Sequence, residues 1–264
     1  KITAYHIGFV LGPCINASGR LDTAARSLAL LNAKTKEEAA RLAGDLTALN
    51  QSRKALTEKG KEEAIRIIET TELKNDRVLV VYLPDCHESL AGIIAGRIRE
   101  KYHRPAFVLT GGETSAKGSG RSIESYSMYE ELVKCADLMI QFGGHPMAAG
   151  LSIEEKNIEE FRRRLNVNCT LMDEELRPKI VIDVPMPVSY ITKELVEQIS
   201  LLEPFGKGNT KPVFAQKNLR VLDYSIIGKN KNVLKLKLLD PQGISVEGIY
   251  FGEAEDFVNF IREK

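Results

Sequence analysis

The sequence predicts an α/β protein whose last third is rich in β-strands, and three observations carry this prediction. Residues 36–70 contain no proline and space their apolar side chains as a long helix requires. Residues 74–172 alternate candidate strands with candidate helices, which is the pattern of an α/β domain. Residues 173–264 change to short strand candidates separated by turns. We therefore expect four parts, at 1–35, 36–73, 74–172 and 173–264.

Composition bounds the class of protein. The formal net charge of +1 over 264 residues means that nucleic-acid contacts would have to come from local basic clusters. Cysteines occur without a CxxC pair, which predicts neither a zinc site nor a disulfide framework and fits a reducing cytosol. They are Cys14, Cys86, Cys135 and Cys169. Because apolar runs are short and no signal peptide is visible, we expect a cytoplasmic protein that contacts no membrane.

The proline-free region would form a connector between two lobes. As one helix it would span about 50 Å, at about 1.5 Å per residue. Gly60 leaves two shorter helices as an alternative, because glycine weakens a helix. The chain also starts without an initiator methionine, at residues that resemble a domain interior, so we interpret it as a fragment.

A strand–helix–strand unit follows the connector. Residues 78–83 form an apolar run typical of a strand buried on both faces, residues 89–102 have helical spacing, and residues 105–109 resemble a second strand. This order predicts a βαβ unit with a right-handed crossover. Between the first strand and the helix, we expect the polar segment 85–88 to cap the helix rather than to bind a metal ion.

Two glycine-rich loops are expected next. We predict a loop at 110–122, a helix at 127–141, a second loop at 142–150 and a helix that ends near Leu165. Ser152-Ile153-Glu154-Glu155 has the form of a capping box for that last helix.

The second loop sets His145 in a backbone without bulky side chains. Gly143 and Gly144 permit positive φ and let amide groups converge on an anion, while a histidine can donate a hydrogen bond or share a proton near neutral pH. This pattern predicts a phosphate or nucleotide site. A tight turn around a core histidine is the alternative.

Arginine occurs in the other loops. In the first glycine-rich loop, Ser119, Arg121 and Ser122 offer a guanidinium and two hydroxyls to phosphate oxygens; a flexible linker is the alternative. Residues 16–22 form a third loop of this character, with Arg20; a helix cap whose arginine faces water is the alternative.

Short strands dominate the last third. Strand candidates lie at 180–184, 212–214, 219–227, 233–239 and 244–251, with a helix at 192–202. The turn Asp240–Gly243 would join the last two strands as a hairpin. This set suits a small OB-type barrel, which commonly binds single-stranded nucleic acid on a basic face that carries aromatic residues.

That basic face would carry Lys229, Lys231, Lys235, Lys237, Tyr224 and Phe205. A solvated strand face whose lysines discourage edge pairing is the alternative.

Six motifs occur together and in order, and they carry a resemblance. They are Ile15–Leu21, Glu88–Arg97, His103-Arg104-Pro105, Gly118–Ser122, Gly143-Gly144-His145 with Ala148-Ala149-Gly150, and Pro204–Gly206 with Gly208-Asn209 and Pro212–Phe214. The ordered set resembles the RecJ family of single-strand-specific DNA exonucleases, within the DHH phosphoesterase superfamily. The resemblance covers almost the whole chain.

The resemblance implies a bilobed enzyme with a DHH-associated α/β domain and an OB-like domain. In that family, an Asp-His-His signature and further aspartates bind two Mn²⁺ or Mg²⁺ ions; this sequence contains no such string, so we expect no metal ion in this chain and place the ions in a lobe that it lacks. Arg20, Ser119 and Arg121 would anchor the terminal phosphate, and His145 would face the metal centre and the scissile phosphate. Many members of that family have Pro-Gly after the histidine that matches His87, whereas this chain has Glu88-Ser89 there.

The predicted function is that of the phosphate- and DNA-binding part of a 5′-to-3′ exonuclease of DNA repair and recombination, inactive by itself. Single-stranded DNA is the expected ligand, and a single-strand-binding protein or a repair helicase is the candidate protein partner. A stand-alone nucleic-acid-binding module, or another DHH-superfamily phosphoesterase acting on short oligonucleotides, are alternatives. A dinucleotide-dependent enzyme ranks last, because no GxGxxG follows the strand at 78–83.

Overall fold

The computed structural model describes residues 2–228, 230–252 and 254–262. It divides into two compact units, Lys1–Pro178 and Lys179–Lys264, which are described separately. Among the residues so described, none of the helices combines the length and the apolar character needed to cross a membrane.

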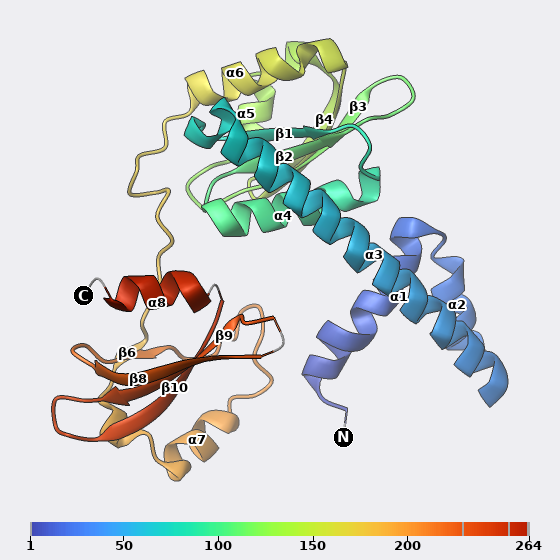
Figure 1. The fold of residues 1–264 in the computed structure, drawn as a ribbon. Coiled ribbons are helices and arrows are strands. Elements are labelled where there is room, and N and C mark those ends of the chain that lie inside the picture. The colour runs from blue at the N-terminus through green and yellow to red at the C-terminus, as the bar shows by residue number, and fades with distance from the viewer. Residues whose placement is uncertain (1, 229, 253, 263–264) are drawn as a thin grey trace. The chain divides into compact units, whose positions relative to one another are not determined.

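The first unit begins with a π-helical turn at His6–Leu11, followed by six α-helices and five strands (Figure 1). The helices are α1 (Gly12–Leu21), α2 (Ala25–Asn32), α3 (Lys36–Thr70), α4 (Glu88–Tyr102), α5 (Met128–Val133) and α6 (Ile158–Asn168). The strands are β1 (Leu79–Leu83), β2 (Ala106–Thr110), β3 (Ala116–Arg121), β4 (Met139–His145) and β5 (Ala148–Ile153).

The connector is one uninterrupted helix. The Thr35 hydroxyl caps α3 by accepting a hydrogen bond from the amide of Glu38, at 3.2 Å. The helix continues through Gly60, so the alternative of two shorter helices is wrong. A Cβ at Gly60 would lie 2.6 Å from Ile94 Cδ1, which shows that the glycine lets α4 approach α3 closely.

The sheet has the order β1-β2-β3-β5-β4, and only its first pair is parallel. Since α4 connects β1 to β2, the predicted βαβ unit is confirmed. Figure 1 shows the sheet with α3 and α4 on one face and α5 and α6 on the other.

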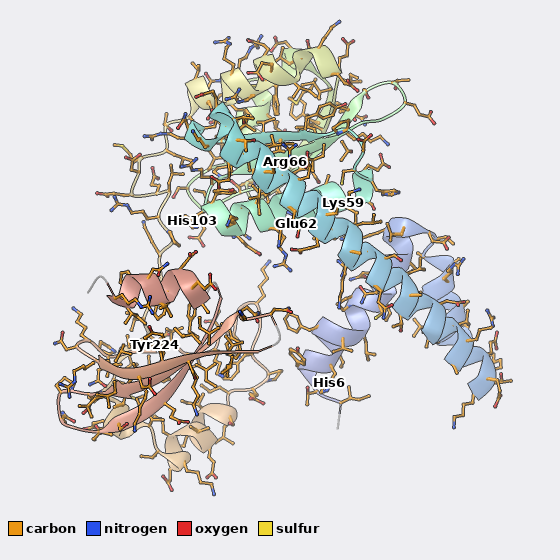
Figure 2. All side chains as sticks on the ribbon, in the orientation of Figure 1. His6, Lys59, Glu62, Arg66, His103 and Tyr224 are labelled. Carbon is orange, nitrogen blue, oxygen red and sulfur yellow. The ribbon has the colours of Figure 1, made fainter. Side chains whose placement is uncertain are left out.

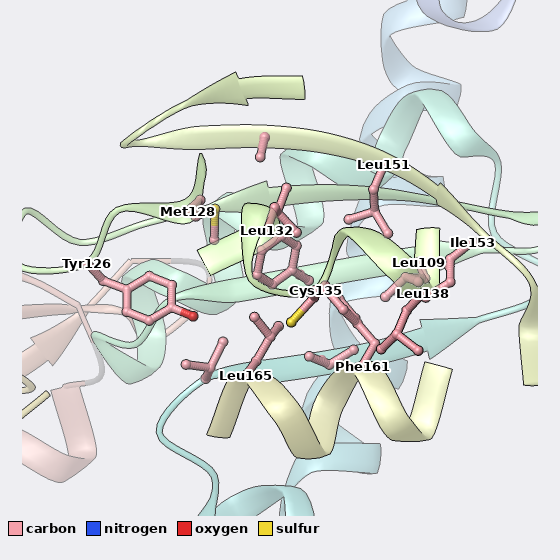
Figure 3. Packing of buried hydrophobic residues seen from close by; sticks show 14 of the residues in the cluster. Leu109, Tyr126, Met128, Leu132, Cys135, Leu138, Leu151, Ile153, Phe161 and Leu165 are labelled. Carbon is pink, nitrogen blue, oxygen red and sulfur yellow. The ribbon is translucent and has the colours of Figure 1, made fainter. Parts of the chain in front are cut away.

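Alternate side chains of β1 and β2 enter two separate cores. Leu79 and Val108 pack with α3 and α4, whereas Val80 and Phe107 pack with α5 and α6. In the second core the rings of Phe107 and Phe161 meet edge to face, with centroids 5.4 Å apart. Figure 3 shows the packing around Phe161. Burial on both faces explains why the two strands are continuous apolar runs.

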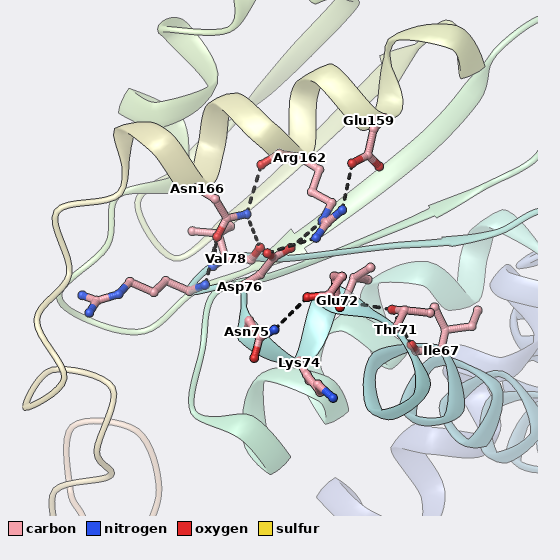
Figure 4. A network of polar contacts seen from close by, with 12 residues as sticks. Ile67, Thr71, Glu72, Lys74, Asn75, Asp76, Val78, Glu159, Arg162 and Asn166 are labelled. Carbon is pink, nitrogen blue, oxygen red and sulfur yellow. Dashed lines mark hydrogen bonds and ion pairs between the residues drawn. The ribbon is translucent and has the colours of Figure 1, made fainter.

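A polar cluster fastens α6 to the start of β1 (Figure 4). The Asn166 carboxamide oxygen accepts hydrogen bonds from the amides of Arg77 and Val78, at 2.9 and 3.0 Å, and its nitrogen donates to the carbonyl of Val78. Beside it, the Arg162 guanidinium forks onto the Asp76 carboxylate, at 2.5 and 3.1 Å.

Several sequence predictions for this unit are wrong. The expected loop at 110–122 contains β3, and the expected helix at 127–141 ends at Val133. The expected loop at 142–150 is a hairpin of β4 and β5, so Ser152 lies in a strand and caps no helix. Residues 16–22 belong to α1 and its C-terminal end rather than to a loop.

The described residues of the second unit form two small sheets. Strands β8 (Arg220–Ile227), β9 (Val233–Leu239) and β10 (Ser245–Phe251) form one sheet in the order β10-β9-β8, and β6 (Val184–Pro185) pairs with β7 (Phe214–Ala215). The helices are α7 (Lys193–Ser200) and α8 (Ala254–Arg262).

The β9–β10 hairpin is confirmed, with the turn closed by the Asp240 carboxylate, which accepts from the amides of Gln242 and Ile244. Leu234 and Leu236 face α8, which the sequence did not predict. Most of the strand expected at 180–184 is not a strand. The described strands form a β-rich region, and the OB-type barrel stays a prediction.

Candidate functional site

Strand β3 presents two different faces. Cβ atoms added at Gly118 and Gly120 would meet Leu151 at 3.0 Å and Phe107 at 2.6 Å, so both glycines face a core that leaves no room for a side chain. Ser119 and Arg121 alternate with them and therefore point to the other face, where α4 lies. The strand thus delivers a hydroxyl and a guanidinium side by side.

The Arg121 guanidinium lies against the backbone of α4. A Cβ built on Gly92 would lie 2.7 Å from Arg121 Nη2 and 3.1 Å from Ser119 Oγ. Arg121 Nη1 donates to the carbonyl of Gly120 at 2.7 Å, and Arg121 makes no ion pair among the described residues. A half-buried cation without a carboxylate partner is costly and suits an anionic ligand.

Other arginines surround Arg121. Burial lowers the pKa of Arg121, and the nearby charges of Arg20 and Arg99 lower it further. Arg20 extends from α1, and its Nη1 donates to the carbonyl of Ser89 at 2.9 Å, which places it at the start of α4. The structure therefore brings together Arg20, Ser119 and Arg121, which the sequence predicted as a phosphate-binding set.

Arg53 lies near Arg20 as well, and the sequence reasoning missed it. We refer to Arg20, Arg53 and Arg121 as the arginine group. The pKa of Arg53 is lowered by burial and then by the charge of Arg20. Asn50, one turn earlier in α3, accepts from Arg53 Nε and Nη2 at 3.2 and 3.0 Å and so orients the guanidinium. The available signal was an arginine that interrupts the apolar positions of the long helix.

His145 ends β4 at an exposed position, so the alternative of a core histidine is wrong. Its Nδ1 accepts a hydrogen bond from the amide of Met147 at 3.3 Å across the two-residue turn. Gly144 has a φ of 155°, and a Cβ there would lie 2.4 Å from the carbonyl oxygen of Ala148, so the hairpin requires glycine at this position.

The register of the sheet relates His145 to the arginine group. Arg121 pairs with Ala148, and Ala148 pairs with His145, so all three side chains share one face. Two strand spacings separate Arg121 from His145, which is roughly 10 Å between their Cα atoms.

On the face that Arg121 shares with His145, small residues leave the surface of the sheet open. Gly150 lies between Ser119 and Gly143 in the same way, and a Cβ on Gly143 would meet nothing within 4 Å. Packing within this unit does not explain the glycine at 143, whereas close approach of a ligand would.

The prediction that Ser122 offers its hydroxyl to a phosphate is wrong. It is only 2% exposed, and its hydroxyl donates to the carbonyl of Tyr126 at 2.5 Å. This bond holds the turn into α5 and leaves no donor for a ligand.

In the second unit, Lys235 and Lys237 lie on the face of β9 opposite to α8, as the alternation predicts. Lys235 Nζ is 2.9 Å from Glu247 Oε1, and Lys237 pairs in register with Glu247 and Asp223. These carboxylates offset part of the basic charge, so a role in DNA binding stays a prediction. Lys229, expected on the same surface, lies outside the described residues.

The segment 85–88 caps α4, but through an imidazole and not through the capping carboxylates that the sequence predicted. The His87 imidazole is the N-cap and accepts from the amide of Ser89 at 3.3 Å. Beside it, a cavity of about 630 Å³ lies between α3 and the end of β1, and Lys59, Glu62 and Arg66 line it from successive turns of α3 (Figure 2). None of the predicted phosphate-binding residues lines this cavity.

The described residues do not fit a metal ion. No group of three or more histidine, cysteine, aspartate or glutamate side chains is arranged to hold one in the described parts of the chain.

Two families match this chain. Residues 75–169 match the DHHA1 domain, and residues 182–264 match the RecJ OB domain. Among curated proteins, the single-stranded-DNA-specific exonuclease RecJ of Bacillus subtilis is 35% identical over 236 residues, which cover 88% of this chain and 30% of the relative. RecJ of Haemophilus influenzae is 36% identical, over 95% of this chain and 45% of the relative. The chain thus spans less than half the length of these relatives.

Solved structures agree with these matches. The crystal structure of RecJ from Thermus thermophilus in complex with Mg²⁺ superposes with a TM-score of 0.80 at 28% identity, over 95% of this chain and 38% of that one. An exonuclease RecJ bound to manganese gives a TM-score of 0.55 at 32% identity, over 62% of this chain and 41% of that one.

Proposed function

Because the chain is a RecJ homologue that carries a DHHA1 domain and a RecJ OB domain, we propose that it is the phosphate- and DNA-binding part of a single-stranded-DNA-specific exonuclease that acts from the 5′ end. One observation carries this proposal: Arg121 is half-buried beside Ser119 and Arg20, with no carboxylate to balance it among the described residues.

A terminal phosphate matches this arrangement in charge and in geometry. It carries up to two negative charges, whereas an internal phosphodiester carries one, so it gains more from several clustered guanidinium groups. Arginine donates two parallel hydrogen bonds to phosphate oxygens, and a serine hydroxyl adds a third. Arg20, Ser119 and Arg121 are the proposed ligands, and Arg53 adds positive charge from α3.

The face that carries Ala148, Gly150 and Gly143, beside Arg121 and His145, would receive the nucleotide that follows the phosphate. Gly143 and Gly150 let a sugar–phosphate backbone approach the strands closely. The exposed imidazole of His145 would donate a hydrogen bond to a phosphate oxygen and stabilise charge that develops there. Since the described residues hold no metal-ligand cluster, the proposed role of this chain is binding and positioning.

The second unit would hold the rest of the strand. The open face of its three-stranded sheet carries Lys235 and Lys237 together with the exposed side chains of Ile249 and Phe251, which are 58% and 73% exposed. Lysines attract the backbone, and an exposed aromatic ring can stack on a base. Use of the whole protein in DNA repair and recombination, with a single-strand-binding protein or a repair helicase as partner, belongs to the same proposal.

The test compares 5′-phosphorylated with 5′-hydroxyl oligonucleotides in equilibrium binding to this chain. Arg121→Ala should reduce the preference for the phosphorylated end roughly 10- to 100-fold, since a hydrogen bond to a charged group contributes about 1.5–3 kcal/mol. Arg163→Ala is the matched control, because Arg163 is an exposed arginine on α6, on the opposite face of the sheet. An unchanged preference in Arg121→Ala would contradict the proposal.

A further inference from the structure

We propose that Gly92 is the positioning residue of the phosphate site. Because Gly92 has no side chain, the Arg121 guanidinium and the Ser119 hydroxyl can lie close to the backbone of α4, and this position sets the preference for a terminal phosphate. This inference rests on the proposed function of the arginine group.

Two glycines of α4 face β3 one helical turn apart, and they contact different parts of Arg121. A Cβ at Gly96 would lie 3.9 Å from Arg121 Cγ, which is an ordinary contact. A Cβ at Gly92 would lie 2.7 Å from Nη2 and 3.4 Å from Cζ of the same side chain. The aliphatic stem of Arg121 therefore passes Gly96 with room for a methyl group, whereas the guanidinium occupies the volume that a side chain at position 92 would take.

Gly92 also limits the position of Ser119, because the same Cβ would lie 3.1 Å from its hydroxyl. Both proposed ligands from β3 thus meet the helix at one backbone position. Neither the fold of α4 nor its packing against the core requires glycine there, since glycine weakens a helix relative to alanine.

This arrangement holds a cation without neutralising it. A carboxylate at the same place would fix the guanidinium by an ion pair, but it would also compete with the phosphate. The backbone of α4 fixes the group by shape, and one hydrogen bond, from Nη1 to the carbonyl of Gly120, adds to it. Among the described residues, no other hydrogen bond of the guanidinium is found.

The atom nearest to a methyl group at position 92 would be Nη2 of Arg121, the end of a flexible side chain. The methyl group should therefore displace the guanidinium rather than unfold the protein. Gly92→Ala is therefore expected to keep or raise the melting temperature and to lower the affinity for a 5′-phosphorylated oligonucleotide about tenfold or more. The affinity for the 5′-hydroxyl oligonucleotide should change little. Gly96→Ala, the same substitution one turn away, should leave both affinities unchanged.

A double-mutant cycle makes the test specific to Arg121. Because the closer contact of Gly92 is with this residue, Gly92→Ala should cause a much smaller loss in the Arg121→Ala background than in the parent, and the loss that remains would be that of Ser119. Should Gly92→Ala unfold the chain, the double variant must restore folding, because the obstructing guanidinium is gone. A double variant that stays unfolded would overturn the inference.

The outcome also separates this inference from the proposed function. If Arg121→Ala removes the phosphate preference and Gly92→Ala retains it, the inference fails and the proposed function stands. If Arg121→Ala retains the preference, the proposed function itself fails.

Discussion

The hydrogen bonds of Asn166 allow a prediction of stability from the structure. Asn166→Ala leaves the amides of Arg77 and Val78 and the carbonyl of Val78 without their partner, at a strand start where Val78 is fully buried. Each unsatisfied buried group costs about 1–3 kcal/mol, and partial access of water at Arg77 reduces the sum. We expect the first unit to lose about 2–4 kcal/mol of unfolding free energy.

Thermal unfolding and amide hydrogen exchange measure this effect together. For a unit of this size, 1 kcal/mol corresponds to about 2–4 °C, so the melting temperature should fall by roughly 5–15 °C. Exchange at Arg77 and Val78 should accelerate, while the phosphate preference of the folded protein should stay, because Asn166 lies away from the arginine group.

Two variants calibrate the result. Asn168→Ala alters the same residue type on the same helix, where no side-chain hydrogen bond is found among the described residues, and should shift the melting temperature little. Asn166→Asp keeps an acceptor for both amides and should lose less than alanine. Equal stability of Asn166→Ala and Asn168→Ala would refute the reasoning.

Three further predictions concern catalysis, charge and pH. In an exonuclease that contains this chain, as proposed above, His145→Ala should lower kcat by roughly 10²–10³ with nearly intact DNA affinity, because it removes an exposed charge-stabilising donor. Single-turnover cleavage and equilibrium binding measure both, and normal turnover would remove His145 from the proposed mechanism. Oligonucleotide affinity should fall steeply with salt, and Arg121→Ala should reduce the slope of log K against log salt by about 0.7; a titration indifferent to salt would argue against phosphate contacts. Hydrogen bonds from Arg163 and then Arg164 lower the pKa of Glu160 to about 2. The stabilisation by its carboxylate should therefore be present above about pH 4.5 and be lost as the pH falls towards 2, so the difference in melting temperature between the parent and Glu160→Gln should vanish there; a constant difference would contradict this.

Strand β3 shows where sequence reasoning fails in this chain. Its residues include no β-branched or aromatic side chain, so its composition indicates a loop. It is a strand because β2 and β5 pair with it on both sides, and because Leu151 and Phe107 fill the space over its glycines. These partners are distant in sequence, and no local pattern reveals them. The same reason hides β4, which forms by pairing with β5.

Patterns that depend on local spacing were predicted correctly. The α3 helix and the βαβ unit follow from apolar periodicity, and the β9–β10 hairpin follows from alternation and a turn sequence. In the site, the sequence predicted Ser119 and Arg121 from residue chemistry. It could not separate them from Ser122, because the strand that turns two of these side chains to one face was itself unknown.

The continuity of α3 has a consequence for ligand binding. Its buried residues are Leu42, Leu46, Asn50, Thr57, Ala64 and Ile68. At 3.6 residues per turn these positions fall within an arc of roughly 80° of the helix circumference. The α1–α2 pair carries Arg20, and the layer formed by α4 and the sheet carries Arg121. Both therefore pack on the same side of one continuous helix, which fixes the angle between them about the helix axis. Inserting one residue between them would turn one set by about 100° against the other and separate the two arginines, although every local contact within each set could survive.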